Sequence, residues 1–430
     1  MRRAFLFAPL LLACLGLLAC ASPSRDGLTE VVIRAETPEG SGRVFLTGSL
    51  PELGPWRADG LEMSGTGRTR TARLRVPADA TFEIKVTQGR WDREGLGPSG
   101  TVMPNVPVAA GSGRETRIVI SDWKHDISEY VRDPDGAGVP GQLIYWRDVA
   151  SPRLAQTRHV SIYLPPQYAS DPDARWPVIY MHDGQNLFDP RIANTGVDWG
   201  VDEAMQTLLQ KDAIRPAIIV GVWSTPDRRF EYAPSGILSA MPETLQPAIL
   251  EDFPAERRAA DAYVSFLVGE LKPRIDAAFR TLGDREHTFL MGSSMGGLIS
   301  LYAMAERPDV FGGAACLSMH WPIGVSERFI GERIDPAWPP AVASAFRTYL
   351  ASKALDPSAH RLWIDRGTGF LDGFYAPYEE AMTPVLTGLG FKAGESLEIR
   401  LYPGANHNEA AWRARLTDPL KFLLRPQTTD

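Results

Sequence analysis

The sequence contains little cysteine, no surplus of positive charge and no strong internal repeat. Its three cysteines are Cys14, Cys20 and Cys316, and no Cys-x-x-Cys pair occurs, which argues against zinc ribbons and thioredoxin-type sites. Lys and Arg total 45 against 52 Asp and Glu, a formal net charge of -7. Nucleic acid is therefore not expected as a partner, because phosphate binding needs concentrated positive charge. With 44% hydrophobic and 23% charged residues in 430, the composition indicates a globular protein of two or three domains.

The N-terminal segment has the pattern of a targeting signal. Two arginines precede an uncharged, mostly apolar stretch over residues 4–19, which is short for a membrane span of about 20 residues and suits a signal peptide. The stretch ends in residues 17–20, Leu-Leu-Ala-Cys, which resemble a bacterial lipobox. That resemblance implies cleavage before Cys20, a lipid anchor on its thiol and, because residue 21 is not Asp, location at the outer membrane. A plain secretory signal cut one or two residues later is the alternative.

Cleavage would leave Cys316 as the one cysteine without a lipid. It lies in the apolar run 312–317, which predicts a buried strand, so we interpret it as an inert core thiol. No disulfide is then expected within the mature chain.

Composition divides the rest of the chain into two domains. Five short runs of β-forming residues separated by turns predict a β-sandwich. Further along, short apolar runs alternate with helical patterns such as residues 263–279, which predicts a mostly parallel, doubly wound α/β sheet. The predicted segments are a signal peptide (1–19), a tether (20–27), a β-sandwich (28–122), a Pro/Gly-rich linker (123–141) and an α/β-hydrolase domain (142–426).

The most specific chemical signal is Gly-Ser-Ser-Met-Gly at residues 292–296. An apolar strand pattern precedes it and a helical pattern follows, which is the context of the nucleophile elbow of α/β-hydrolases. The central serine, Ser294, is the predicted nucleophile. Ser293 is a rival, but it is not at the centre of the motif.

A serine needs a base, and in this fold the order along the chain is serine, acid, histidine. His320, His360 and His407 follow Ser294. His407 comes after the strand-like run 397–402 through a turn, where the base is expected. His360 precedes a strand, at the wrong edge of the sheet, and His320 is better interpreted as a pocket residue.

Two carboxylates could orient this histidine, and both belong to one segment. Asp365 ends a predicted strand, whereas Asp372 lies in the loop beyond it. We favour Asp372, because the loop gives it reach towards the imidazole, which it would hold in one tautomer.

An oxyanion hole needs two backbone N–H groups. One is expected from Met295, the residue after the nucleophile, and the other from Gly184 or Gln185 in the loop after an early strand. We interpret His182 and Asp183 in the same loop as a structural turn.

Several segments together resemble the bacterial putative esterase family, which includes feruloyl, acetylxylan and enterochelin esterases. These segments are residues 163–166, 180–188, 228–234, 292–297 and 404–409. The resemblance covers about 280 residues and implies an ester hydrolase without metal or other cofactor, with Ser294, Asp372 and His407 as its triad. Candidate pocket residues, for which packing or a structural ion pair is the alternative, are Trp199, Arg228, Tyr232, His320 and Trp321.

The first domain carries its own resemblance. Residues 48–56 and 82–91 are similar to the starch-binding type of carbohydrate-binding module, which implies sugar stacking on Trp56 and Trp91. A core or spacer role is the alternative.

Three functions fit these features. The leading one is a membrane-anchored esterase acting on a feruloyl or acetyl group of a polysaccharide. The others are a siderophore esterase and a sugar-binding lipoprotein with an inactive hydrolase domain.

Overall fold

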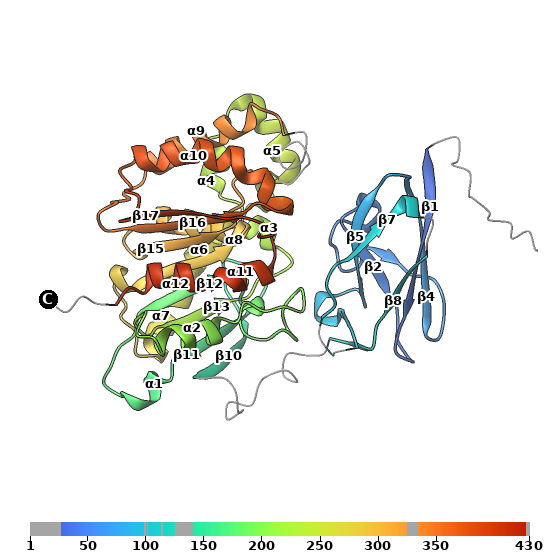
Figure 1. The fold of residues 1–430 in the computed structure, drawn as a ribbon, viewed down its shortest axis with the longest axis horizontal. Coiled ribbons are helices and arrows are strands. Elements are labelled where there is room, and N and C mark those ends of the chain that lie inside the picture. Colours follow the sequence, from blue (N-terminus) through green and yellow to red (C-terminus); the bar gives the residue numbers. More distant parts are fainter. Residues whose placement is uncertain are drawn as a thin grey trace, which may run out of the picture. The chain divides into compact units, whose positions relative to one another are not determined.

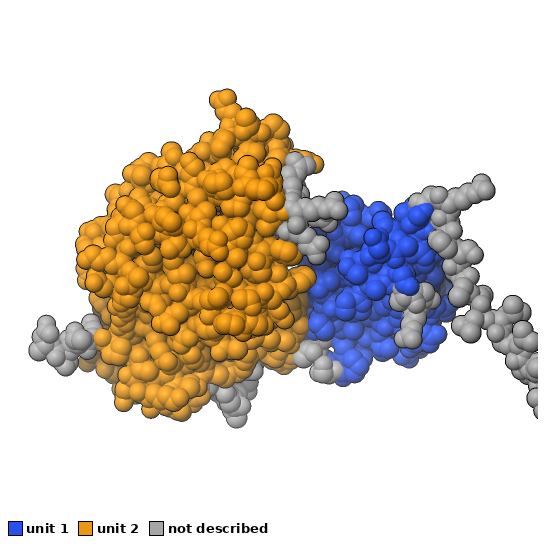
Figure 2. Space-filling model, turned by 45° about the horizontal axis from the view of Figure 1, so that its top comes forward, with its two compact units in different colours: residues 1–125 blue, residues 126–430 orange. Residues whose placement is uncertain are grey.

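The computed structural model describes residues 27–98, 100, 102–112, 115–124, 141–324 and 334–426. The chain forms two compact units, Met1–His125 and Asp126–Asp430 (Figure 2). The predicted signal peptide, Cys20 and most of the linker lie outside the described residues. None of the helices in the described part is long and apolar enough to cross a membrane.

The first unit is all-β. Its strands are β1 (Leu28–Glu36), β2 (Phe45–Gly48), β3 (Leu61–Glu62), β4 (Thr69–Pro77), β5 (Thr81–Thr87), β6 (Gly95–Leu96), β7 (Val106–Ala109), β8 (Thr116–Val119) and β9 (Asp122–Trp123). They form sheets in the orders β4-β1-β8, β3-β2-β5-β7 and β6-β9. Ile33 and Leu74 from one sheet and Leu46 and Ile84 from another share one core, as a sandwich requires.

This β unit extends beyond the boundary predicted at residue 122. Trp123, which the sequence analysis places in the linker, is 6% exposed and belongs to the core. Its Nε1 donates a hydrogen bond to the Ser41 hydroxyl at 2.8 Å. A two-residue strand is too short to show a periodicity, so the pattern could not reveal it.

The two candidate sugar-binding tryptophans, Trp56 and Trp91, are both partly exposed. Trp56 has a positive φ of 53°, and Trp91 begins a short 3-10 helix after β5. The hydroxyl of Thr87, the last residue of β5, donates to the carbonyl of Ala58 at 2.5 Å, which joins the two loops.

The second unit is built on one eight-stranded sheet. Its order is β10-β11-β13-β12-β14-β15-β16-β17, with β11 antiparallel to both neighbours and the strands from β13 to β17 parallel. The strands are β10 (Gln142–Val149), β11 (Arg158–Leu164), β12 (Val178–His182), β13 (Ile218–Val222), β14 (Thr288–Ser293), β15 (Gly313–Leu317), β16 (Arg361–Gly367) and β17 (Leu397–Tyr402). This is the sheet of an α/β-hydrolase, as predicted.

Helices cover both faces of this sheet (Figure 1). They are α1 (Gln167–Ser170), α2 (Val201–Leu209), α3 (Arg228–Glu231), α4 (Ser235–Ser239), α5 (Gln246–Asp252), α6 (Ala260–Phe266), α7 (Lys272–Ala278), α8 (Met295–Glu306), α9 (Trp338–Ala351), α10 (Ala376–Gly388), α11 (Glu409–Arg415) and α12 (Thr417–Leu423). Successive residues of a strand point to opposite faces. Leu290 therefore belongs to the core under α8, α9 and α10, whereas Phe289 and Met291 belong to the core under α2 and α12.

Substitution of two leucines, one buried and one exposed, tests this description of the core. Leu290→Ala should lower the free energy of unfolding by about 2–5 kcal/mol, because the side chain is fully buried in the central strand β14 and its loss leaves a cavity. Leu401→Ala on β17, where the side chain is 49% exposed, should change it by less than about 0.5 kcal/mol. Urea unfolding of both variants measures the difference; equal losses would contradict this account of the core.

Candidate active site

The loop between β14 and α8 forms a strained turn at Ser294. This residue has φ 56° and ψ -125°, a backbone conformation that residues other than glycine adopt only at a cost of about 1–3 kcal/mol. A Cβ on Gly292 would lie 2.6 Å from the carbonyl carbon of Gly296, so the turn closes only with glycine there. Ser294 is partly exposed and sits at the amino end of α8, where developing negative charge is favoured.

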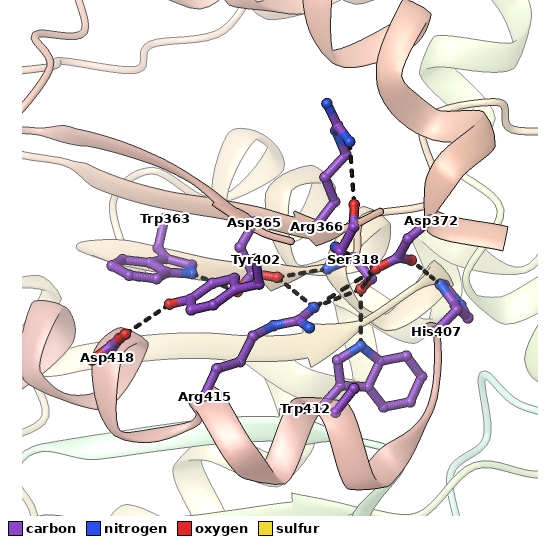
Figure 3. Close-up of polar contacts among 12 residues, drawn as sticks. Ser318, Trp363, Asp365, Arg366, Asp372, Tyr402, His407, Trp412, Arg415 and Asp418 are labelled. Atoms are coloured by element: carbon purple, nitrogen blue, oxygen red, sulfur yellow. Dashed lines mark hydrogen bonds and ion pairs between the residues drawn. The ribbon is translucent and has the colours of Figure 1, made fainter. Parts of the chain in front are cut away.

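Two other predicted residues come together beside this turn. His407 lies between β17 and α11, and its Nδ1 is 2.6 Å from Oδ1 of Asp372 (Figure 3). Asp372 is fully buried in the 3-10 turn Phe370–Tyr375, which follows β16. A carboxylate accepts, so Nδ1 carries the proton and Nε2 is left to accept one.

The buried carboxylate of Asp372 is held in its charged form. Its Oδ2 accepts hydrogen bonds from the Ser318 hydroxyl at 2.7 Å and from the N–H of Gly367 at 2.5 Å. Burial alone would raise the pKa of Asp372, but the hydrogen bonds and the charge of His407 outweigh it, so this pKa lies below 3.8. Asp372 is therefore ionised wherever an imidazole base can work.

Ser318 is the centre of this network and is not among the site residues predicted from the sequence. Its hydroxyl accepts from Trp412 Nε1 at 2.9 Å and from the guanidinium of Arg415 at 2.7 Å (Figure 3). With both donors in place, its own proton goes to Asp372. Ser318 follows β15 with a positive φ of 41°, and no sequence motif marks it.

The second candidate acid, Asp365, has a different partner. Its Oδ1 accepts from Arg415 at 2.8 Å and from the N–H of Ser318 at 3.1 Å, and its Oδ2 accepts from Trp363 Nε1 at 2.9 Å. Asp365 thus orients Arg415, whereas Asp372 contacts the imidazole.

Tyr375 lies between Ser294 and His320 and forms a hydrogen bond with each. His320 Nε2 lies 3.0 Å from the carbonyl of Gly324, and its Nδ1 lies 2.8 Å from the Tyr375 hydroxyl. Burial lowers the pKa of His320 to about 3, so the ring is neutral, donates from Nε2 and accepts from Tyr375. Burial raises the pKa of Tyr375, and a hydrogen bond from Ser294 opposes this shift. Because the proton of the Tyr375 hydroxyl points to His320 Nδ1, the phenol oxygen is left to accept a hydrogen bond from the Ser294 hydroxyl.

The Tyr375 ring also stands edge-on to His407, with ring centroids 5.6 Å apart. Ser294 and His407 thus contact the same ring, and within the described part of the chain no direct hydrogen bond joins them. Rotation about one side-chain bond of Ser294 would turn its hydroxyl from Tyr375 towards the imidazole of His407. Hydrogen bonds between catalytic side chains are often long before substrate binds.

The predicted oxyanion loop lies against the nucleophile turn. Gly184 and Gln185 form a buried 3-10 turn, and a Cβ on Gly184 would lie 2.3 Å from the backbone of Gly221. A Cβ on Gly296 would lie 3.3 Å from Asp183 Oδ2, so this loop and the start of α8 are in close approach. The N–H of Met295, in the first turn of α8, has no partner within the helix.

Most of the predicted pocket residues are core residues in this structure. Trp199, Tyr232, His320 and Trp321 are at most 4% exposed. Trp199 packs on Trp412, with centroids 5.6 Å apart, and so supports the ring that flanks His407. The predicted packing alternative describes these side chains better than direct substrate contact.

Arg228 forms an ion pair. Its Nε is 2.6 Å from Asp183 Oδ1 and its guanidinium carbon lies 5.0 Å from the Tyr232 ring centroid. His182 Nδ1 is 2.9 Å from the Tyr263 hydroxyl. These contacts make His182 and Asp183 structural, as interpreted from the sequence.

Comparison with known proteins gives a family and distant relatives. The family model described as "Putative esterase" matches residues 151–423. Uncharacterized protein YbbA of Bacillus subtilis (strain 168) is 25% identical over 169 residues, 39% of this chain and 59% of that protein. Ferri-bacillibactin esterase BesA of the same strain is 26% identical over 191 residues, 43% of this chain and 60% of that protein. The chain thus spans about three fifths of the length of these curated relatives.

Among solved structures, a ferulic acid esterase is 20% identical with a TM-score of 0.46. The match covers 66% of this chain and 98% of that one.

Ser318→Ala tests the network. Asp372 should lose a charge-assisted hydrogen bond of about 1.5–3 kcal/mol, which corresponds to a fall of roughly ten- to a hundredfold in kcat/KM for an ester substrate. Ser41→Ala is the matched control, because Ser41 also accepts from an indole, that of Trp123, but in the other unit. If both variants kept wild-type kcat/KM, Ser318 would have no part in positioning the acid.

Proposed function

The chain is a member of the putative esterase family, and on that premise we propose that it is a serine carboxylic ester hydrolase that works through an acyl-enzyme. The observation that carries the proposal is the 2.6 Å contact between His407 Nδ1 and Asp372 Oδ1, beside a serine at a positive φ of 56°. The three residues occur in the order expected for this fold.

The proposed first half-reaction forms the acyl-enzyme. Ser294 Oγ attacks the carbonyl carbon of the ester while its proton passes to His407 Nε2. The N–H groups of Met295 and of Gly184 or Gln185 bind the oxyanion of the tetrahedral intermediate. His407 then returns the proton to the alcohol oxygen as the ester bond breaks.

The second half-reaction repeats the sequence with water. His407 takes a proton from water as the hydroxide oxygen bonds to the acyl carbon, and the proton returns to Ser294 when the acid leaves. The negative charge of Asp372 stabilises the imidazolium in both halves.

The nucleophile assignment makes a sharp prediction. Ser294→Ala should lower kcat for p-nitrophenyl acetate by about 10⁴-fold or more, because the acyl-enzyme can no longer form. Ser293→Ala, one residue earlier and 4% exposed, should retain most of the activity. Equal rates for wild type and Ser294→Ala would refute the proposed nucleophile.

For the substrate we propose an ester on a carbohydrate, such as a feruloyl or acetyl group. The support is the likeness of the β unit to starch-binding modules together with the partial exposure of Trp56 and Trp91. Exposed indole rings can stack on the apolar faces of sugars. Siderophore ester hydrolysis is the second candidate, favoured by the similarity to ferri-bacillibactin esterase BesA.

A comparison of polymeric and soluble esters tests the carbohydrate proposal. The Trp56→Ala, Trp91→Ala double variant should lose activity on feruloylated or acetylated xylan and keep it on methyl ferulate, because methyl ferulate carries no sugar on which an indole ring could stack. Retention on xylan in a pull-down reports binding separately. Hydrolysis of a catecholate trilactone in the absence of hydrolysis of either carbohydrate ester would replace the carbohydrate proposal with the siderophore one.

A further inference from the structure

A cleft of about 710 Å³ opens at the edge of the sheet away from the triad. Its lining includes Gly312, Arg361 and Ser396, which lie at the amino ends of the parallel strands β15, β16 and β17. The triad residues follow the carboxyl ends of such strands. The strand β16 has seven residues, and a strand rises about 3.3 Å per residue, so the length of the strand separates the cleft from the triad. The cleft is therefore distinct from the proposed active site.

Positive charge dominates the wall of this cleft. The basic residues that line it are Arg285, Arg361, Lys392 and Arg425. The lining acids are Glu286 and Glu395, whose side chains are 74% and 70% exposed and lie at 3.8 Å from Arg285 and 3.5 Å from Lys392. Both acids thus lie on the solvent side, as does Lys392, which is 72% exposed.

Two of these arginines form no ion pair with a carboxylate in the described part of the chain. Within the described part of the chain, no ion pair within 4.0 Å involves Arg361 or Arg425. Arg425 donates to the backbone carbonyl of Glu395 at 3.2 Å, and the Arg361 guanidinium lies 4.7 Å from the Phe289 ring centroid.

The cluster is electrostatically unfavourable without a counter-charge. Burial, with the charges of Arg215 and Arg425, lowers the pKa of Arg361 to about 10. Among the described residues, the Nε of Arg285, which lines the cleft, is buried without a hydrogen-bond acceptor. Buried charges and donors of this kind are normally neutralised or satisfied.

We propose that this cleft binds a phosphate group through Arg361, Arg425 and Arg285. A phosphate ester carries close to two negative charges and three acceptor oxygens, which matches several arginine side chains lining one cleft better than a single carboxylate does. We take this phosphate group to be part of either a soluble phosphate ester or a lipid headgroup.

Calorimetric titration of the full chain with pyrophosphate tests the site. We expect Arg425→Gln and Arg361→Gln each to weaken binding about tenfold or more, the loss of one charged contact. Arg117→Gln is the matched control, because this arginine is 71% exposed in the β unit. Ester hydrolysis should be unchanged in all three variants. Arg425 is exposed, so its variant keeps the test sound if Arg361→Gln fails to fold.

Vesicles distinguish the two sources of phosphate. Binding to phosphatidylcholine vesicles containing phosphatidic acid, lost in Arg425→Gln, would identify a lipid headgroup; pyrophosphate binding without vesicle binding would identify a soluble ligand. No binding of either probe to the wild type at millimolar concentration, or equal affinity of Arg425→Gln, Arg117→Gln and wild type, would overturn the proposal.

Discussion

A negative charge kept out of water is the constraint on which the candidate active site depends. Asp372 is fully buried, and an isolated carboxylate in such a place would take up a proton. Donors from β16, from the residue after β15 and from the loop after β17 hold it ionised instead. Because these donors come from three neighbouring strands, the charge is stable only when the sheet has its full register.

The same network separates the roles of two carboxylates that look alike in the sequence. Asp365 is neutralised by Arg415, and Arg415 also donates to Ser318, so one ion pair directs the proton of a hydroxyl towards Asp372. The Asp365–Arg415 ion pair therefore orients the Ser318 hydroxyl, and this hydroxyl donates a hydrogen bond that stabilises the charge of Asp372.

Much of the fold and the central residues of the site could be predicted from the sequence. Buried strands are continuous apolar runs in the sequence, and the glycines around Ser294 indicate a tight turn. The local sequence pattern is therefore enough to predict the strands and the nucleophile turn. Ser318, Tyr375, Trp412 and Arg415 could not be found in this way, because their roles arise from contacts between segments up to 97 residues apart. For Trp199 and Tyr232 the sequence leaves a pocket position and a core position open, because aromatic residues near a motif suit either, and only the packing separates the two.

The position of the histidine in the chain has a consequence for synthesis. His407, Trp412 and Arg415 follow the last strand of the sheet, so a growing polypeptide acquires its base and two of the acid's supports only after all eight strands have been made. A partly synthesised chain would carry the serine turn without a base to activate it. The proposed triad would then be complete only after the last strand of the sheet has been made.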